Sequence, residues 1–152
     1  MKALRRLSLV RVHKVTDIGI FSLAEHATAL ERLHLSYCDS LSLEAIHLLL
    51  RKLESLQHLT TTGVPSFRRK GIHRFSDAPP TVCTLFICGI FAHLRSLWQT
   101  NDPNQQAAFR VFSGENVAAL RRFLDKEDKR RQDAEAKNIP FTPRSDDKFD
   151  LY

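Results

Sequence analysis

The sequence predicts an α/β fold built as a short solenoid, in which strand–helix units stack side by side. Two observations support this prediction: a 26-residue repeat in the first half of the 152-residue chain, and a strand pattern followed by a helix pattern within each copy. A third observation is the helical periodicity that follows residue 113. The expected organisation is repeats over 1–78, an inserted apolar stretch and linker over 79–106, a C-terminal cap helix over 107–137 and a disordered tail over 138–152.

The repeat is visible when the chain is laid on itself at an offset of 26 residues. Eight columns then keep register across three copies without a gap. The first two columns are Leu4, Leu30, Leu56 and Leu7, Leu33, Leu59. Each copy reads L-x-x-L-x-L and continues into a helical stretch, which is the pattern of a leucine-rich repeat. We therefore expect a short leucine-rich-repeat solenoid of three repeats, stabilised by the stacking of neighbours.

Each element of the repeat follows from its residue pattern. In the x-L-x-L-x segment the leucines of a short strand point inward, and the residues between them point out onto a concave parallel sheet. "TDIGIFSLAEH" then predicts a helix on the convex side, with Thr16 or Asp17 as its N-cap. "SLEAIHLLLRKL" predicts the same helix in the second copy, capped by Ser42.

The stretch "VTDIGIFSLAEHATALERLHLSYCDSLSLEAI" resembles the cysteine-containing subclass of leucine-rich repeats. "LESLQHLTTTGVPSFRRKGIHRFS" and "AAFRVFSGENVAALRRFL" are similar to the last repeat and C-terminal cap of fungal F-box proteins of the glucose-repression type. The resemblance covers Leu4–Ser76 and, more weakly, Ala107–Leu124. It implies a substrate receptor of an SCF ubiquitin ligase that reads acidic or phosphorylated protein targets.

One departure from that family concerns the start of the chain. No F-box precedes the repeats, because Met1 lies three residues before the first leucine of a strand. The chain is therefore expected to be the C-terminal part of a longer receptor, which reaches the SCF adaptor only through the missing F-box. The alternative is a truncated product with no independent function. With no polar cap on the first repeat, we expect the isolated chain to be marginally stable or self-associating.

The segment 81–102 is a second departure, because the family runs almost directly from the proline-rich segment to the cap. One interpretation is a translated intron or another annotation artefact. The other is an irregular fourth repeat, because the apolar run 82–90 falls 26 residues after the third strand. We favour an insertion that docks as a strand or helix on the open end of the repeats.

The C-terminal helix is predicted to begin near Ser113. Its apolar residues Val117, Leu120, Phe123 and Leu124 share one face. The stripe ends at Leu124, so the second half is expected to be solvated. The segment "NIPFTPRSDDKFDLY" has two prolines and no periodicity, which predicts disorder.

The concave face contains the candidate binding site. Its first outward column is Arg6, Arg32 and His58, a ladder of basic groups on adjacent strands about 5 Å apart. Arg11 and the "FRRK" of 67–70 extend the positive charge to the rim. The candidate substrate-binding residues are Arg6, Ser8, Arg32, His34, Ser36, His58, Thr60, Arg68 and Arg69.

Hydroxyls beside arginines suit a carboxylate or phosphate, which arginine binds with two parallel hydrogen bonds. The alternative interpretation is that like charges on a solvated sheet only tolerate one another. The net charge of +6 and pI of about 9.5 favour anionic partners in a general way. Nucleic acid is the weaker expectation, and a basic scaffold that binds nucleic acid or another polyanion is the alternative function.

The chemistry-bearing residues favour a non-enzymatic protein. Cys38 shares a column with Val12 and Val64, so it is expected to fill space as a small apolar group. Cys83, Cys88 and His93 have a C-x4-C-x4-H spacing that is unusual for zinc. No glycine-rich phosphate loop is present, and no histidine is placed by sequence beside an acidic orienter. We expect no metal, no cofactor and no membrane span.

The expected location is cytoplasmic or nuclear. Met1 leads directly into a stretch in which Arg and Lys are interleaved, unlike a secretory signal. Three cysteines form an odd count that does not indicate a disulfide framework. Both observations favour a reducing compartment.

Overall fold

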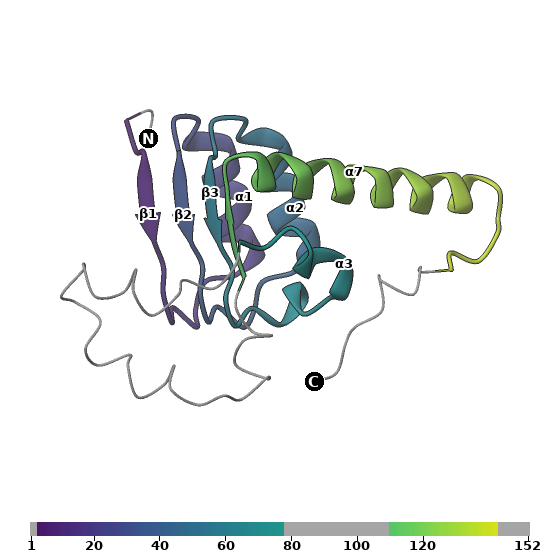
Figure 1. Ribbon diagram of the computed structural model, residues 1–152, viewed down its shortest axis with the longest axis horizontal. Coiled ribbons are helices and arrows are strands. Elements are labelled where there is room, and N and C mark those ends of the chain that lie inside the picture. Colours follow the sequence, from purple (N-terminus) through teal and green to yellow (C-terminus); the bar gives the residue numbers. More distant parts are fainter. Residues whose placement is uncertain (1–2, 78–109, 143–152) are drawn as a thin grey trace.

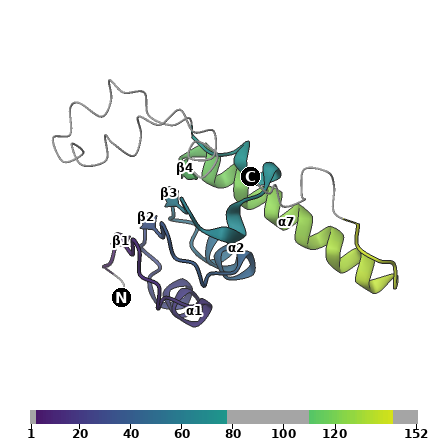
Figure 2. The same cartoon turned by 90° about the horizontal axis from the view of Figure 1, so that it is seen from below.

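The computed structural model describes residues 3–77 and 110–142, which form a mixed α/β arrangement around one four-stranded sheet (Figure 1). The elements in chain order are β1 Arg6–Ser8, α1 Asp17–His26, β2 Arg32–His34, α2 Leu43–Lys52, β3 His58–Thr60, the 3-10 helix η1 Pro65–Phe67, α3 Lys70–His73, β4 Val111–Ser113 and α7 Glu115–Ala136. Helices α1 and α2 lie on one side of the sheet, and α7 lies at the β4 end, away from β1 (Figure 2).

The first three strands are parallel and neighbours in the sheet, in the order β1-β2-β3. Leu7 is in register with Leu33, and Leu33 with Leu59, so the pairing offset equals the 26 residues read from the sequence. Leu33 and Leu59 are fully buried, whereas Leu7 is only half-buried because β1 is the edge strand. Each strand therefore depends on its neighbours on both sides for burial.

In the layer of helices, too, burial is lower near β1 than in the middle of the fold. Ile46 and Leu49 of α2 are fully buried, because α1 packs beside this helix. At the β1 end Val12 is 38% exposed and Ile18 of α1 is 78% exposed. The sequence predicts an inward position for Val12, and this prediction is wrong because no described segment covers the β1 end.

Two helix caps were predicted, and they have different outcomes. The Ser42 hydroxyl accepts a hydrogen bond from the Ala45 backbone N–H at 3.1 Å, so this N-cap is confirmed. Thr16 stands at the N-cap position of α1, but its side chain makes no capping bond. Asp17 is inside the helix, and its carboxylate accepts a hydrogen bond from the Ser42 N–H at 2.9 Å. It therefore connects α1 to the start of the next helix.

Strand β4 closes the other edge of the sheet and was not predicted. It pairs antiparallel with β3, and Phe112 is in register with Leu59. The following helix begins at Glu115, two residues after the predicted start near Ser113. The run 82–90 lies outside the described residues. The β3 edge that it would have joined as a fourth strand is occupied by β4.

Helix α7 packs on α2 through its polar residues as well as its apolar stripe. Arg121 donates hydrogen bonds to the Leu50 carbonyl at 2.6 Å and the Leu53 carbonyl at 3.1 Å. These carbonyls lie at the C-terminal end of α2, where a cation is favourable. The predicted solvation after Leu124 is wrong for Glu127, which is buried, whereas Lys126 is exposed as predicted. The residues that follow Glu127 are half-buried or exposed.

The predicted disordered tail is described only over 138–142. The Ile139 backbone N–H donates to the Ala134 carbonyl at 2.9 Å. The Phe141 ring lies beneath Arg131, whose guanidinium carbon is 5.3 Å from the ring centroid. The described part of the tail therefore turns back onto the end of α7, which differs from the prediction of disorder. Residues 143–152 lie outside the described residues.

The turn after each of the three parallel strands has a residue with positive φ. These residues are Arg11 (φ 57°), Tyr37 (φ 59°) and Gly63 (φ 74°), spaced by 26. Only the third is glycine, the residue that adopts this conformation without a steric cost. A Cβ atom at position 63 would lie 2.5 Å from Cδ1 of Tyr37, so the glycine is also needed for space.

Gly63→Ala is therefore expected to destabilise the protein by about 1–3 kcal/mol, from overpacking and backbone strain together. Urea denaturation followed by circular dichroism measures this change. The matched control is Gly19→Ala in α1, where a Cβ would meet no atom within 4 Å. That control should stabilise the helix by about 1 kcal/mol. Equal effects of the two substitutions would contradict the packing argument.

Candidate protein-binding face

The first outward column lies across the three parallel strands. Arg6 is in register with Arg32, and Arg32 with His58. Both arginines are exposed, and His58 is half-buried. No carboxylate of the described residues lies within ion-pair distance of Arg6 or Arg32, whereas the adjacent Arg5 is paired with Glu31 at 2.7 Å. Two cations are thus presented side by side, and no residue of 3–77 or 110–142 forms an ion pair with them.

The second row consists of Ser8, His34 and Thr60. The rings of His34 and His58 are tilted against each other, with centroids 5.2 Å apart. Burial and the charge of Arg32 lower the pKa of His34. Burial, His34 and Arg32 lower the pKa of His58, and Asp77 opposes this shift. Both imidazoles are therefore neutral at pH 7, and the column has two formal charges instead of the three basic groups predicted.

Two predicted contact residues are almost closed to solvent. Thr60 is 7% exposed because its strand is interior, with His34 and Val111 as cross-strand neighbours. Its hydroxyl lies 3.3 Å from Nε2 of His58. Ser36 is 8% exposed and lies between the chain segments of the first and third copies. The prediction that Thr60 and Ser36 are open to a ligand is wrong, while Ser8 is exposed.

The rim residues also differ from the prediction. Arg68 is exposed, but Arg69 is 6% exposed and its Nη2 lies 2.8 Å from Oε1 of Glu127 on α7. Arg69 therefore adds nothing to the surface charge, because α7 covers it. Arg11 is exposed as predicted, and its guanidinium stands over the Tyr37 ring, 5.4 Å from the centroid. Tyr37, which is 42% exposed, was not predicted as a surface residue of this face.

The β4 end of the column carries the opposite charge. Ser113 is in register with His58, and its hydroxyl donates to Oδ2 of Asp77 at 2.6 Å. Asn116 donates to Oδ1 of the same carboxylate at 2.6 Å. Asp77 is therefore fixed in place beyond His58. The charge of this face therefore changes from positive at Arg6 and Arg32, on β1 and β2, to negative at Asp77, beside β4. We refer to the outward side of the sheet, from Arg6 to Asp77, as the binding face.

Cys38 lies behind the sheet, away from the binding face. It is fully buried, and its Sγ–H donates to the Leu9 carbonyl at 2.9 Å. Burial is the main cause that raises the pKa of the thiol, which disfavours the reactive thiolate. This agrees with the space-filling role predicted for Cys38. Cys83, Cys88 and His93 lie outside the described residues.

Two negative findings apply to residues 3–77 and 110–142. No group of three or more His, Cys, Asp or Glu side chains in these ranges is placed to hold a metal ion. No helix in the same ranges is both long enough and apolar enough to cross a bilayer.

The chain is similar to the SCF E3 ubiquitin ligase complex F-box protein pof2 of Schizosaccharomyces pombe (strain 972 / ATCC 24843), with 33% identity over 122 residues. The aligned region takes in 80% of this chain and 22% of the relative, so the chain spans about a fifth of the relative's length. No family model matches the chain, and no solved structure matches it significantly.

Proposed function

We propose that this chain is a protein-binding module of the leucine-rich-repeat class that forms the substrate-recognition part of a ubiquitin-ligase receptor. The similarity to an F-box protein of an SCF complex supports a related, non-enzymatic role. Because the chain spans 22% of that relative, the link to a ligase belongs to the longer protein. An SCF adaptor would be recruited by a separate F-box, and the proposed setting is cytoplasmic or nuclear.

The observation that carries the proposal is the pair Arg6 and Arg32. They are in register on adjacent strands, exposed, and without an ion-pair partner among the described residues. Adjacent strands are about 4.8 Å apart, so both guanidinium groups can reach one phosphate or two neighbouring carboxylates. The proposed ligand is accordingly an acidic or phosphorylated segment of a protein.

The charge gradient of the binding face orients such a segment. Its anionic group lies over Arg6 and Arg32, because Asp77 repels it from the β4 end. The neutral rings of His34 and His58 offer hydrogen-bonding nitrogen atoms beside the arginines. Tyr37 offers an exposed aromatic surface at the rim, of the kind enriched at protein interfaces. The face binds and positions its ligand and performs no chemistry.

The test is the double substitution Arg6→Ala/Arg32→Ala. The probe is a fluorescent acidic 15-residue peptide with one phosphoserine, compared by anisotropy with the same peptide without phosphate. Hydrogen bonds to charged groups each contribute about 1.5–3 kcal/mol. The Kd for the phosphopeptide should therefore rise by at least about tenfold. The matched control Lys52→Ala/Lys137→Ala removes the same charge from exposed positions elsewhere and should leave the Kd unchanged.

Two outcomes would contradict the proposal. Equal losses in the two double variants would show that only net charge matters. Binding of a DNA duplex with a steep salt dependence and without preference for the phosphopeptide would instead favour a polyanion-binding scaffold.

A further inference from the structure

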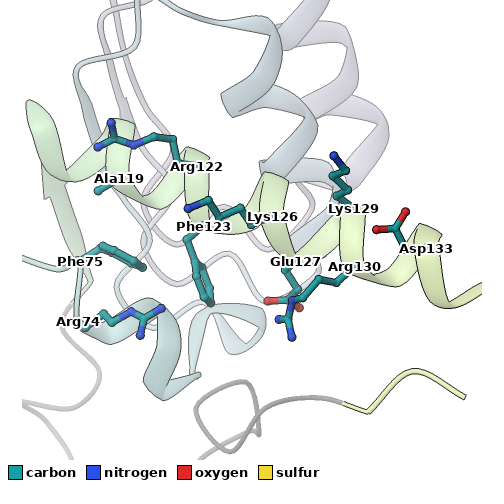
Figure 3. Close-up of a pocket in the computed structure, with 10 residues that line it drawn as sticks. All are labelled: Arg74, Phe75, Ala119, Arg122, Phe123, Lys126, Glu127, Lys129, Arg130 and Asp133. Atoms are coloured by element: carbon teal, nitrogen blue, oxygen red, sulfur yellow. The ribbon is translucent and has the colours of Figure 1, made fainter.

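A second basic surface lies apart from the binding face, in a cavity of about 580 Å³ between α3 and α7 (Figure 3). All the residues that line it come from α7 and from the two positions after α3. The volume is within the range of small-molecule sites, about 300–1,000 Å³. The cavity is therefore large enough for a small ligand and is independent of the sheet strands.

One wall of this cavity is an aromatic pair with an arginine on it. The rings of Phe75 and Phe123 have centroids 5.3 Å apart. The guanidinium carbon of Arg74 lies 4.9 Å from the Phe75 centroid and 4.8 Å from the Phe123 centroid. Stacking on two rings holds a guanidinium in position by cation–π attraction. A positive group is thus already oriented at the cavity before any ligand arrives.

Helix α7 also brings a row of cations to the cavity. Arg122, Lys126 and Lys129 follow at spacings of four and three residues, which places them on one side of the helix (Figure 3). All three are exposed. No carboxylate of the described residues lies within ion-pair distance of any of them. Like charges at this spacing destabilise a helix, so an external anion would relieve the repulsion.

Two acidic residues of α7, Glu127 and Asp133, line the cavity beside five cations, and the other acidic groups nearby contact α2. Asp125 contacts His47 at 2.7 Å, and Asp128 contacts Arg51 at 3.7 Å, both on α2. Glu127 touches the cavity, but it is engaged by Arg69 at 2.8 Å. The α2 side of α7 is therefore charge-matched, and the α3 side has an excess of positive charge.

We propose that this cavity binds a small ligand with clustered phosphates, such as a nucleoside triphosphate or a linear polyphosphate. Arg122 and Lys129 are seven residues apart, or about 10 Å along the helix axis. A single phosphate contacts only part of that row, whereas a chain of phosphates spans it. The apolar surface of Phe75 and Phe123 lies beside the row and can contact a nucleobase.

The test uses the full chain and its Lys126→Gln/Lys129→Gln variant in calorimetric titrations without added metal ions. The probes are ATP, tripolyphosphate and inorganic phosphate at matched ionic strength. ATP and tripolyphosphate should bind the unmodified chain, and the Kd of each should rise by at least about tenfold in the variant. Tighter binding of ATP would show that the base contributes, and equal binding would show that phosphates suffice. The matched control Lys14→Gln/Lys52→Gln removes the same charge from exposed positions outside the cavity and should leave both Kd values unchanged.

Three outcomes would overturn the proposal. The first is an equal Kd in the cavity variant and the control variant. The second is binding of inorganic phosphate as tightly as tripolyphosphate, and the third is no binding of either polyphosphate. Arg6→Ala/Arg32→Ala is expected to bind ATP normally, so failure of the cavity and failure of the binding face are distinguishable.

Discussion

Glu127→Ala is expected to destabilise the fold by about 3–5 kcal/mol, because it removes a buried carboxylate that pairs with the buried guanidinium of Arg69. The side chains of Arg69 and Glu127 are only 7% and 5% exposed, and their charged atoms are 2.8 Å apart. This low exposure limits how far water can replace the lost carboxylate. Urea denaturation followed by circular dichroism measures the change in the free energy of unfolding.

Two controls separate the buried pair from the general effect of losing a carboxylate. Asp128→Ala removes a partly exposed charge whose contact to Arg51 is 3.7 Å long, and the two side chains, Arg51 and Asp128, are 55% and 35% exposed. Its cost should stay below about 1 kcal/mol. The double change Arg69→Met/Glu127→Leu should recover much of the loss, since a buried ion pair can be replaced by packed apolar groups. A Glu127→Ala cost no larger than that of Asp128→Ala would refute the argument.

The parallel part of the sheet could be predicted because its information is periodic. Leu33 and Leu59 recur at the same offset as Leu7, and a fixed offset determines both the strand register and the residues that point outward. The neighbouring positions of Arg6 and Arg32 follow from the same period. The period does not predict which arginines form ion pairs. Arg5, which precedes Arg6 in the sequence, is paired with Glu31.

The C-terminal closure could not be predicted, since its contacts are non-periodic and distant in sequence. The "FRRK" stretch reads as exposed charge, yet Arg69 is buried by Glu127, 58 residues away. Strand β4 has three residues, too few for a clear alternation, and is identified only by its pairing with β3. The burial of Arg69 and the pairing of β4 with β3 both depend on residues after position 110, which the pattern of the repeats does not describe.

The outward column of Arg6, Arg32 and His58 was predicted in register, but the exposure of the neighbouring residues was not. Strand alternation places the Thr60 side chain outward, but it does not predict that neighbouring side chains on β2 and β4 reduce its exposure. Tyr37 was missed, although the period contained a signal for it. Gly63 lies 26 residues later, and a glycine at the end of a strand marks a turn whose equivalent positions share the same backbone conformation.

Phe112→Ala should also cost about 3–5 kcal/mol, the range for a buried aromatic truncated in a core. Phe112 is fully buried in β4, in register with Leu59, and packs edge-on against Phe67 at a centroid distance of 6.1 Å. It is the residue of β4 that is buried in the core, whereas α7 contacts the core through its own residues Val117, Leu120 and Leu124. Loss of this contact weakens the pairing on the β3 edge as well as the core itself.

The weaker pairing on the β3 edge distinguishes Phe112→Ala from a substitution that only leaves a cavity in the core. When β4 detaches, the β3 edge presents unpaired backbone groups, which are a template for association with another chain. Phe112→Ala should therefore show concentration-dependent association by light scattering, in addition to a lower unfolding free energy. The matched control Val117→Ala truncates a buried residue of α7 and leaves the residues of β4 unchanged, so it should lower stability without increasing association above that of the unsubstituted chain. If the two variants associate equally, edge closure by β4 is not what limits association, and the exposed β1 end with Val12 and Ile18 becomes the surface responsible.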